Sequence, residues 1–483
     1  MKTVDALNKS RTPRIGFFGF GKSNEAVYNY LKDCGYTFDP VFRFSGGFPT
    51  ELNVPCDSTV FSGVCAEALI DENVLFLSPS VRRDSPALTE AIGRGVTLSS
   101  DTELFFEKLT GDAIGVTGSD GKSTTTYLIA STLKHDFGAM PVGNFGVGAV
   151  SVLGKCAMPV VELSSFQLSY CKPRLRRAVI TNISENHLNW HRDLDEYIDA
   201  KMNILAMAKE IIYDFDSPIV REKLKGGSVF CVVSLDFEYS QLLSLGVAEN
   251  IVTFKNDTIY LNDTPFIHLG FAKRKEEYNI RNYMLTVGAC IGLCDKNRVR
   301  EAILSFGGLP HRGEIVGEIG CGKAGEAEGG FEKSCGESNC LKSGSIKIIN
   351  SSIDTTPTRT LATLKSLRGG EVALILDGRS KGGDYSELIS RLDKLTCGVI
   401  LCGEVGEEIY KILSSRYEFK DYSYKECANI KSAITEAARL LPRGGYILYS
   451  PSGTSFDRFK NFEERGEAFR LAARELCDGF LCG

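Results

Sequence analysis

A glycine-rich stretch at residues 115–126, Gly-Val-Thr-Gly-Ser-Asp-Gly-Lys-Ser-Thr-Thr-Thr, has the residue types that bind phosphate groups. It follows a short apolar run and leads into residues 127–130, which contain no helix breaker, so we expect a strand, a glycine turn and a helix start. In that arrangement Lys122 reaches the β- and γ-phosphates and the Ser123 hydroxyl lies on Mg²⁺. The first glycine of the turn is Gly118, so the loop is shorter than the standard pattern. The stretch predicts ATP binding.

Candidate metal ligands follow two further strand-like runs. Glu162 lies near the end of the apolar run 159–163. An acid at the carboxyl end of a strand, beside a phosphate loop in the same sheet, is suited to hold Mg²⁺. The next run, 178–182, leads to His187 and His191, two of the five histidines in the chain. One of them is a candidate to bind a metal or orient phosphate, although such a pair is as often part of a core or a surface.

Two other features allow both a functional and an ordinary interpretation. Gly19 and Gly21 follow a strand-like run and precede a helical pattern, but the third glycine of a dinucleotide-binding turn is replaced by Asn24. Ordinary turn chemistry and a diphosphate contact are therefore equally plausible there. Lys201 belongs to a helix pattern that begins near Tyr197, and by spacing alone we expect a solvated surface lysine.

Strand-like runs alternate with helical patterns along the chain, which predicts an α/β fold with parallel sheets. We divide the chain into three domains. Residues 1–110 begin with a Rossmann-like strand, turn and helix, residues 111–308 form a central P-loop sheet, and residues 309–483 form a second Rossmann-like domain. Residues 320–345 are rich in Gly, Glu, Lys, Ser and Cys, and we expect them to be a mobile insert.

Composition narrows the class of protein. The net charge of −5 argues against a nucleic-acid partner, which normally needs a basic face. The sequence has no apolar run of membrane-spanning length and no signal peptide at its start. The 16 cysteines show no regular framework, so we expect reduced thiols in a cytoplasmic protein that has no membrane partner.

Three stretches together resemble the Mur ligase family. They are the shortened phosphate loop, residues 162–168 (Glu-Leu-Ser-Ser-Phe-Gln-Leu) and residues 450–466, which begin Ser-Pro-Ser-Gly-Thr-Ser-Phe-Asp and are the most specific of the three. The resemblance extends from about residue 14 to residue 475 and excludes the 320–345 insert. It implies an ATP-dependent ligase that adds D-glutamate to UDP-N-acetylmuramoyl-L-alanine through an acyl-phosphate intermediate, in peptidoglycan precursor synthesis.

The resemblance also implies a role for each matching residue. Separately, we expect the chain to be a monomer. The implied ATP-binding residues are Gly118, Ser119, Asp120, Gly121, Lys122, Ser123, Thr124, Asn279, Asn282 and Arg312. The implied metal ligands, for two Mg²⁺ ions, are Ser123, Glu162, His187 and a Lys201 that is carbamylated by CO₂. The implied substrate-binding residues are Ser23, Asn144, Ser164, Thr355, Lys381, Ser455 and Phe462. Lys122, His187 and Lys201 are the implied catalytic residues, which reverses the surface interpretation of Lys201.

Some positions depart from the family pattern. Ser351 stands where an ATP-contacting acid is common, and Asp354 is a candidate to replace that acid. Arg43 lies where the uridine site usually has an acidic strand end. Two alternatives stay open: another amino-acid ligase of the Mur or folylpolyglutamate type, and a catalytically silent nucleotide-binding protein. The presence of Lys122, Glu162, His187 and Lys201 together argues against the silent protein, because a binding module needs no second metal and no carbamate.

Overall fold

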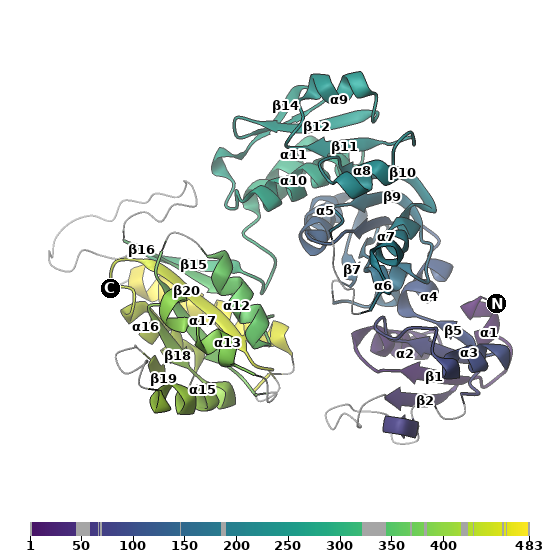
Figure 1. The fold of residues 1–483 in the computed structure, drawn as a ribbon, viewed down its shortest axis with the longest axis horizontal. Helices are drawn as coiled ribbons and strands as arrows, with labels where there is room; N and C mark the ends of the chain where they lie inside the picture. Colours follow the sequence, from purple (N-terminus) through teal and green to yellow (C-terminus); the bar gives the residue numbers. More distant parts are fainter. Residues whose placement is uncertain are drawn as a thin grey trace. The chain divides into compact units, whose positions relative to one another are not determined.

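The computed structural model describes residues 2–44, 58–65, 67, 70–144, 146–184, 190–320, 344–367, 370–380, 384–416, 424–427, 429–455, 458–459 and 461–481. They belong to two compact units, residues 1–305 and residues 306–483 (Figure 1). Both units consist of sheets with helices, which confirms the α/β class. His187, Lys381 and residues 321–343 of the expected insert lie outside the described residues.

The first sheet of the first unit is parallel, with strand order β3-β2-β1-β4-β5. Its strands are β1 (Arg14–Phe18), β2 (Asp39–Phe44), β3 (Thr59–Ser62), β4 (Val74–Leu77) and β5 (Thr97–Ser99). Its helices are α1 (Thr3–Leu7), α2 (Lys22–Asp33), α3 (Pro86–Gly93) and α4 (Asp101–Lys108). The ring of Phe17 stacks on Phe42 and on Phe76, with centroids 5.4 and 5.8 Å apart. These rings join the three central strands in one apolar core.

The turn between β1 and α2 is closed by the residue that replaces its third glycine. The buried Asn24 amide donates hydrogen bonds to the carbonyls of Phe18 (3.3 Å), Gly19 (2.6 Å) and Phe76 (3.2 Å). An asparagine at this position therefore ties the turn to β4 through its side chain, which a glycine cannot do.

An ion pair crosses the core of the same sheet. Arg43 Nη2 lies 2.7 Å from Glu72 Oε1, and both side chains are fully buried. The pair is close to Gly16 of β1, where a Cβ would lie 3.1 Å from Glu72 Cγ and 2.5 Å from Leu75 Cδ1. The guanidinium also lies 4.5 Å from the ring centroid of Phe61. The arginine at this strand end is therefore part of the core of the first sheet.

The second sheet of the first unit has the order β14-β13-β12-β11-β10-β9-β6-β8-β7 and is parallel from β7 to β12. Its strands are β6 (Ile114–Thr117), β7 (Pro141–Gly143), β8 (Val160–Glu162), β9 (Arg174–Ile180), β10 (Met207–Asp214), β11 (Cys231–Ser234), β12 (Asn250–Lys255), β13 (Thr258–Leu261) and β14 (Thr264–His268). Its helices are α5 (Lys122–Phe137), α6 (Ser165–Leu168), α7 (Leu194–Met202), α8 (Pro218–Lys223), α9 (Tyr239–Leu245), α10 (Glu277–Cys290) and α11 (Lys296–Ser305).

The expectation of wholly parallel sheets is wrong at one edge of this sheet. Strands β12, β13 and β14 pair antiparallel. Two-residue turns join them, and Asn256, Asp257, Asn262 and Asp263 of these turns all have positive φ between 48° and 60°. Tight hairpins need this conformation, and Asn and Asp adopt it more readily than most residues. The repeated Asn-Asp pair was the local signal for these hairpins.

The second unit contains one sheet with the order β15-β16-β20-β17-β18-β19. Its strands are β15 (Glu314–Gly320), β16 (Ser345–Asn350), β17 (Val372–Asp377), β18 (Gly398–Leu401), β19 (Tyr424–Glu426) and β20 (Gly445–Ser452). Its helices are α12 (Pro357–Ser366), α13 (Ser386–Ile389), α14 (Leu392–Leu395), α15 (Gly403–Ser415), α16 (Ile430–Arg439) and α17 (Phe462–Leu481). Strand β15 pairs antiparallel with β16 and the other pairings are parallel, so the expectation of a parallel sheet is wrong at this edge as well. Among the helices of the described chain, none combines the length and apolar character needed to cross a bilayer.

The buried ion pair of the first sheet gives a stability prediction. Glu72→Gln removes the carboxylate that pairs with the buried Arg43 guanidinium, so we expect the free energy of unfolding to fall by about 3–5 kcal/mol. Denaturant unfolding followed by circular dichroism measures this. The control is Glu90→Gln, which breaks the exposed Arg94–Glu90 pair and should cost less than about 0.5 kcal/mol. Equal effects of the two substitutions would contradict a structural role of the buried pair.

Candidate active site

The phosphate loop connects β6 to α5 and turns at two glycines. Gly118 has φ 152° and Gly121 has φ 77°, conformations that favour glycine. A Cβ on Gly118 would lie 1.8 Å from Thr181 Oγ1, and a Cβ on Gly121 would lie 2.4 Å from Asn282 Oδ1. Neighbouring side chains therefore leave no room for larger residues. The loop ends at the N-terminus of α5, where the helix dipole and the backbone amides of the first turn favour phosphate.

The middle of the loop is held by the end of β9 and by α7. The Ser119 amide donates to the Asn182 carbonyl at 2.8 Å, and the Asp120 amide donates to Asn182 Oδ1 at 3.0 Å. Ser119 Oγ lies 2.8 Å from the Tyr197 hydroxyl. Sequence reasoning did not single out Asn182 or Tyr197. A polar residue at a strand's carboxyl end was a signal for Asn182, whereas Tyr197 has no local signal.

Two lysine amines converge on one carbonyl of this loop. Lys122 Nζ donates to the carbonyls of Gly118 (2.9 Å) and Ser119 (2.8 Å). Lys201 Nζ donates to the same Gly118 carbonyl at 2.6 Å. Two cations near one oxygen repel each other, so an anion between or beside them would stabilise the arrangement. The loop is therefore electrostatically suited to phosphate.

Lys201 is buried, so the surface position expected from spacing is wrong. Only 2% of the residue is exposed, and its amine lies 4.7 Å from the Tyr197 ring centroid. Burial, and next the charge of Lys122, lower the pKa of Lys201 to about 7, although Asp120 and Glu162 oppose that shift. A lysine with this pKa is largely a neutral, nucleophilic amine at slightly alkaline pH.

Glu162 has a carboxylate oxygen that is available for a cation. The residue is 1% exposed at the end of β8, and its Oε1 accepts a hydrogen bond from Asn144 Nδ2 at 2.9 Å. Its Oε2 is buried without a hydrogen-bond partner in the described part of the chain. A buried anionic oxygen is costly unless a cation or donor satisfies it. With the Ser123 hydroxyl in the first turn of α5, the donors are the hard oxygens that Mg²⁺ prefers.

The described residues alone do not form a complete metal centre. No group of three or more His, Cys, Asp and Glu side chains suited to a metal ion occurs among them. His187 is outside this part of the chain. The predicted set of Ser123, Glu162, His187 and Lys201 therefore remains a prediction.

The two asparagines predicted to bind ATP lie on α10 and are both buried. Asn282 Oδ1 accepts a hydrogen bond from Thr125 Oγ1 at 3.1 Å and packs against the loop at Gly121. Asn279 Nδ2 donates to Glu276 Oε2 at 2.9 Å. Asn282 thus supports the phosphate loop directly, and Asn279 lies one helical turn before it. Thr124 is half-buried in the first turn of α5.

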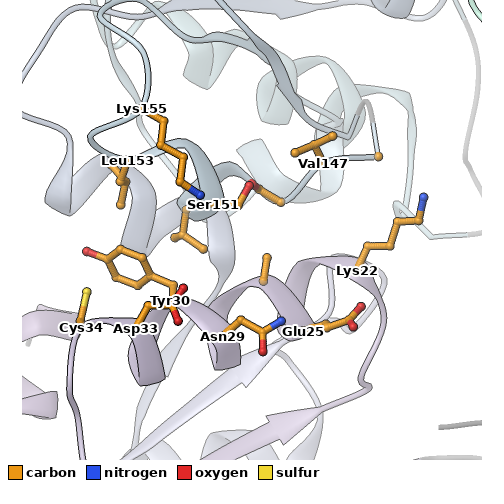
Figure 2. Close-up of a pocket in the computed structure, with 14 residues that line it drawn as sticks. Lys22, Glu25, Asn29, Tyr30, Asp33, Cys34, Val147, Ser151, Leu153 and Lys155 are labelled. Carbon is orange, nitrogen blue, oxygen red and sulfur yellow. The ribbon is translucent and has the colours of Figure 1, made fainter. Parts of the chain in front are cut away.

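The residues predicted to bind the UDP-linked substrate lie on three elements of the first unit. Ser23 is in the first turn of α2, and Asn144 follows β7. The Ser164 hydroxyl caps α6, where it accepts a hydrogen bond from the Gln167 amide at 3.3 Å. A pocket of about 600 Å³ lies beside α2, and Figure 2 shows its walls on α2 and on the 146–155 segment. Its lining residues include Lys22, which precedes Ser23 in the chain, and Gly146, which lies two residues after Asn144.

The second unit carries the remaining predicted residues. Ser455 is 3% exposed, Thr355 is half-buried and Arg312 is exposed. Phe462 begins α17, and its ring centroid lies 6.5 Å from that of His311. Lys381 is outside the described residues.

Asp354, the candidate to replace the missing acid, is itself anchored. Its Oδ2 accepts hydrogen bonds from Ser450 Oγ at 2.9 Å and Thr363 Oγ1 at 2.7 Å. Its carbonyl accepts from the Ser452 amide at 2.8 Å. Asp354 therefore joins the loop after β16 to the end of β20.

The lack of space for a side chain at Gly118 of the phosphate loop gives a prediction for Gly118→Ala. The added Cβ would clash with Thr181 Oγ1, and strain of about 1–3 kcal/mol should weaken ATP binding by about tenfold or more. Isothermal titration with ATP and Mg²⁺ measures the change. The control is Gly93→Ala at the end of α3, where a Cβ has no neighbour within 4 Å. Wild-type affinity in Gly118→Ala would contradict the steric argument.

Comparison with known proteins identifies the family of the chain. Residues 116–290 match the Mur ligase middle domain. The UDP-N-acetylmuramoylalanine–D-glutamate ligase of Ruminiclostridium cellulolyticum is 32% identical over 98% of this chain and 98% of its own length. The enzyme of that name from Acetivibrio thermocellus is 30% identical over 97% of this chain and 98% of its own length. The crystal structure of UDP-N-acetylmuramate–alanine ligase from Thermotoga maritima is 17% identical, with a TM-score of 0.51 over 96% of this chain and 100% of its own, and supports the fold. The chain belongs to the Mur ligase family, among the UDP-N-acetylmuramoylalanine–D-glutamate ligases.

Proposed function

We propose that this chain joins D-glutamate to the L-alanine carboxylate of UDP-N-acetylmuramoyl-L-alanine, with ATP converted to ADP and phosphate, in peptidoglycan precursor synthesis. The observation that carries the proposal is the similarity to ligases of that name over 98% of the chain. The phosphate loop, with Glu162 and Lys201 beside it, supports the use of ATP.

The reaction needs activation because a carboxylate is a poor electrophile. The alanine carboxylate attacks the γ-phosphorus of ATP, the bond to ADP breaks, and an acyl phosphate forms. The D-glutamate amine then attacks the acyl carbon, loses a proton and displaces phosphate. Phosphoryl transfer of this kind needs positioning and charge neutralisation more than covalent help from the protein.

The residues of the first unit supply those two requirements. We assign the loop amides, Lys122 and the first turn of α5 to the ATP phosphates. Mg²⁺, when bound, would neutralise phosphate charge, and Glu162 with Ser123 would hold it. Asn282 keeps the loop in place by packing against Gly121.

We further propose that Lys201 is carbamylated. Its neutral amine attacks the carbon of CO₂, a nitrogen–carbon bond forms and the nitrogen loses a proton to water. The product is an anion beside Lys122, which would replace the repulsion between two ammonium groups by attraction. The pKa of about 7 supports this, since only the neutral amine is nucleophilic. His187 and this carbamate would then serve a second Mg²⁺.

The wider assignments follow from the same proposal. We assign residues 1–110 to the UDP-linked substrate, residues 111–308 to ATP and residues 309–483 to D-glutamate. The proposed amino-acid residues are Thr355, Lys381, Ser455 and Phe462, with Arg312 assigned to ATP and Ser23, Asn144 and Ser164 to the UDP-linked substrate. We also propose a monomer that works in the cytoplasm, where ATP and UDP-linked precursors are available.

Phosphate release tests the proposed reaction. With ATP, Mg²⁺, UDP-N-acetylmuramoyl-L-alanine and D-glutamate present, we expect steady release, and omission of any one of them should reduce the rate to background. L-Glutamate should not replace D-glutamate. Release that needs a different amino acid would favour another ligase of the family, and no release with all components would favour a silent nucleotide-binding protein.

Lys201→Ala tests the carbamate. We expect kcat to fall by about 10²–10³, because a charged group at the reacting centre is lost. Acetate should restore part of the activity, and a ¹³C carbamate signal from labelled CO₂ should be present in the wild type only. Lys209→Ala is the control, since its side chain is 67% exposed and pairs with Asp112. Full activity in Lys201→Ala would remove the carbamate from the mechanism.

A further inference from the structure

The segment after β4 of the first sheet contacts the region before and at the start of α7 of the second sheet, chiefly through Arg82. Arg82 Cζ lies 4.9 Å from the Trp190 ring centroid, and its Nη1 donates to the Trp190 carbonyl. Arg82 Nη2 lies 3.2 Å from Glu196 Oε1 in the first turn of α7. The Trp190 indole in turn donates to the Ser80 carbonyl at 2.9 Å. Arg82 Nη2 also lies 2.7 Å from Asp84 Oδ2, so one guanidinium holds an indole face, a carbonyl and two carboxylates.

Glu196 is the second fixed point of this contact. Its Oε2 accepts a hydrogen bond from the Arg192 amide at 2.6 Å and lies 3.9 Å from His191 Nδ1. The Asp193 carboxylate caps the same helix by accepting from the Glu196 amide at 2.7 Å. Two contacts thus fix the start of α7. One comes from Arg82, in the segment after β4, and the other from the helix cap Asp193.

From Trp190 a continuous set of contacts leads to the phosphate loop. The centroids of Trp190 and His191 are 4.6 Å apart, and those of His191 and Tyr197 are 5.3 Å apart. The Tyr197 hydroxyl lies 2.8 Å from Ser119 Oγ. The Tyr197 ring also packs against the amine of Lys201. A displacement of Trp190 would therefore reach Ser119 of the phosphate loop and the amine of Lys201.

The path is rigid rather than a loose surface contact. His191 and Tyr197 are 2% and 0% exposed, and His191 Nε2 lies 2.9 Å from Ser165 Oγ at the start of α6. Close-packed aromatic rings of this kind transmit a shift instead of absorbing it. A misplacement of about 1 Å at a reacting centre lowers the reaction rate about 10²-fold. A small shift of Ser119 or Lys201 would therefore affect catalysis.

We propose that Arg82 is a positioning residue for the catalytic centre: through Trp190 and Glu196 it fixes α7, and thereby Tyr197, Ser119 and Lys201. The inference rests on the proposed ligase function. Arg82 itself contacts none of the groups assigned to ATP. A merely structural role would lower stability alone, whereas a positioning role also changes kcat at constant affinity for D-glutamate.

Trp190 provides a direct readout, because it is the only tryptophan of the chain. Binding of ATP with Mg²⁺ at the loop should change its fluorescence in the wild type, through Ser119, Tyr197 and His191. In Arg82→Gln the indole loses its cation, so we expect the ATP-dependent change to be lost. The titration uses ATP and Mg²⁺ alone and does not depend on the amino-acid substrate.

Arg82→Gln should lower kcat by about 10- to 100-fold. The KM for D-glutamate should change by less than about twofold, because the residues proposed for it lie in the second unit. Arg82→Lys should restore little of the lost kcat. An ammonium group cannot lie flat against the indole ring and at the same time donate to a carbonyl and a carboxylate, as a guanidinium does. The control is Arg94→Gln, which breaks the exposed pair with Glu90 in the same domain and should leave kcat and fluorescence unchanged.

Unchanged kcat and an unchanged fluorescence response in Arg82→Gln would overturn the inference. If that variant does not fold, Glu196→Gln takes its place: it keeps the guanidinium–indole contact but removes the carboxylate that Arg82 holds at the start of α7, and an unchanged kcat in this variant would overturn the inference. A wild-type chain without ligase activity would overturn the proposed function alone. In that case a fluorescence response that Arg82→Gln abolishes still supports the positioning role.

Discussion

The convergence of Lys122 and Lys201 on the Gly118 carbonyl is the interaction on which the rest of the centre depends. Two ammonium groups at one oxygen are stable only where the chain forces them together and where anions can join them. The glycine at 118 permits the approach, because any side chain there would collide with Thr181. The burial of Lys201 lowers its pKa, so its amine loses its proton, and with it the positive charge, more readily than an exposed lysine does.

That convergence requires α7 to deliver a lysine into the interior of the second sheet. An isolated helix would expose a lysine, and the cost of burying one is met here by a carbonyl, an aromatic face and nearby carboxylates. Tyr197 is central to this, since it contacts both Lys201 and the loop residue Ser119. Burying Lys201 thus lowers the stability of the fold but fixes the geometry of the site, as is common at functional centres.

Local patterns of sequence predicted the strand, glycine turn and helix of the loop at 115–126, because these elements are adjacent in the chain, and they also placed Glu162 at the end of a strand. They failed for Lys201, because its burial depends on packing between elements that are 83 residues apart at the Gly118 contact. The Arg82–Trp190 contact joins residues 108 apart and has no periodic signal either. The antiparallel edge was predictable in principle, since each Asn-Asp pair is a hairpin turn. Only the family resemblance predicted a role for Lys201 in the site, whereas spacing alone predicted a surface lysine.

The second unit also buries a basic side chain, and there it is an arginine, Arg465. The fully buried Arg465 guanidinium donates to the carbonyls of Ser352, Gly453 and Thr454. Both terminal nitrogens of this buried guanidinium are hydrogen-bonded to these carbonyls, so Arg465 holds the loops after β16 and β20 in one fixed arrangement. The proposed amino-acid residues Thr355 and Ser455 belong to these loops. Each unit thus orders loops of its own through a buried basic side chain, Lys201 in the first unit and Arg465 in the second.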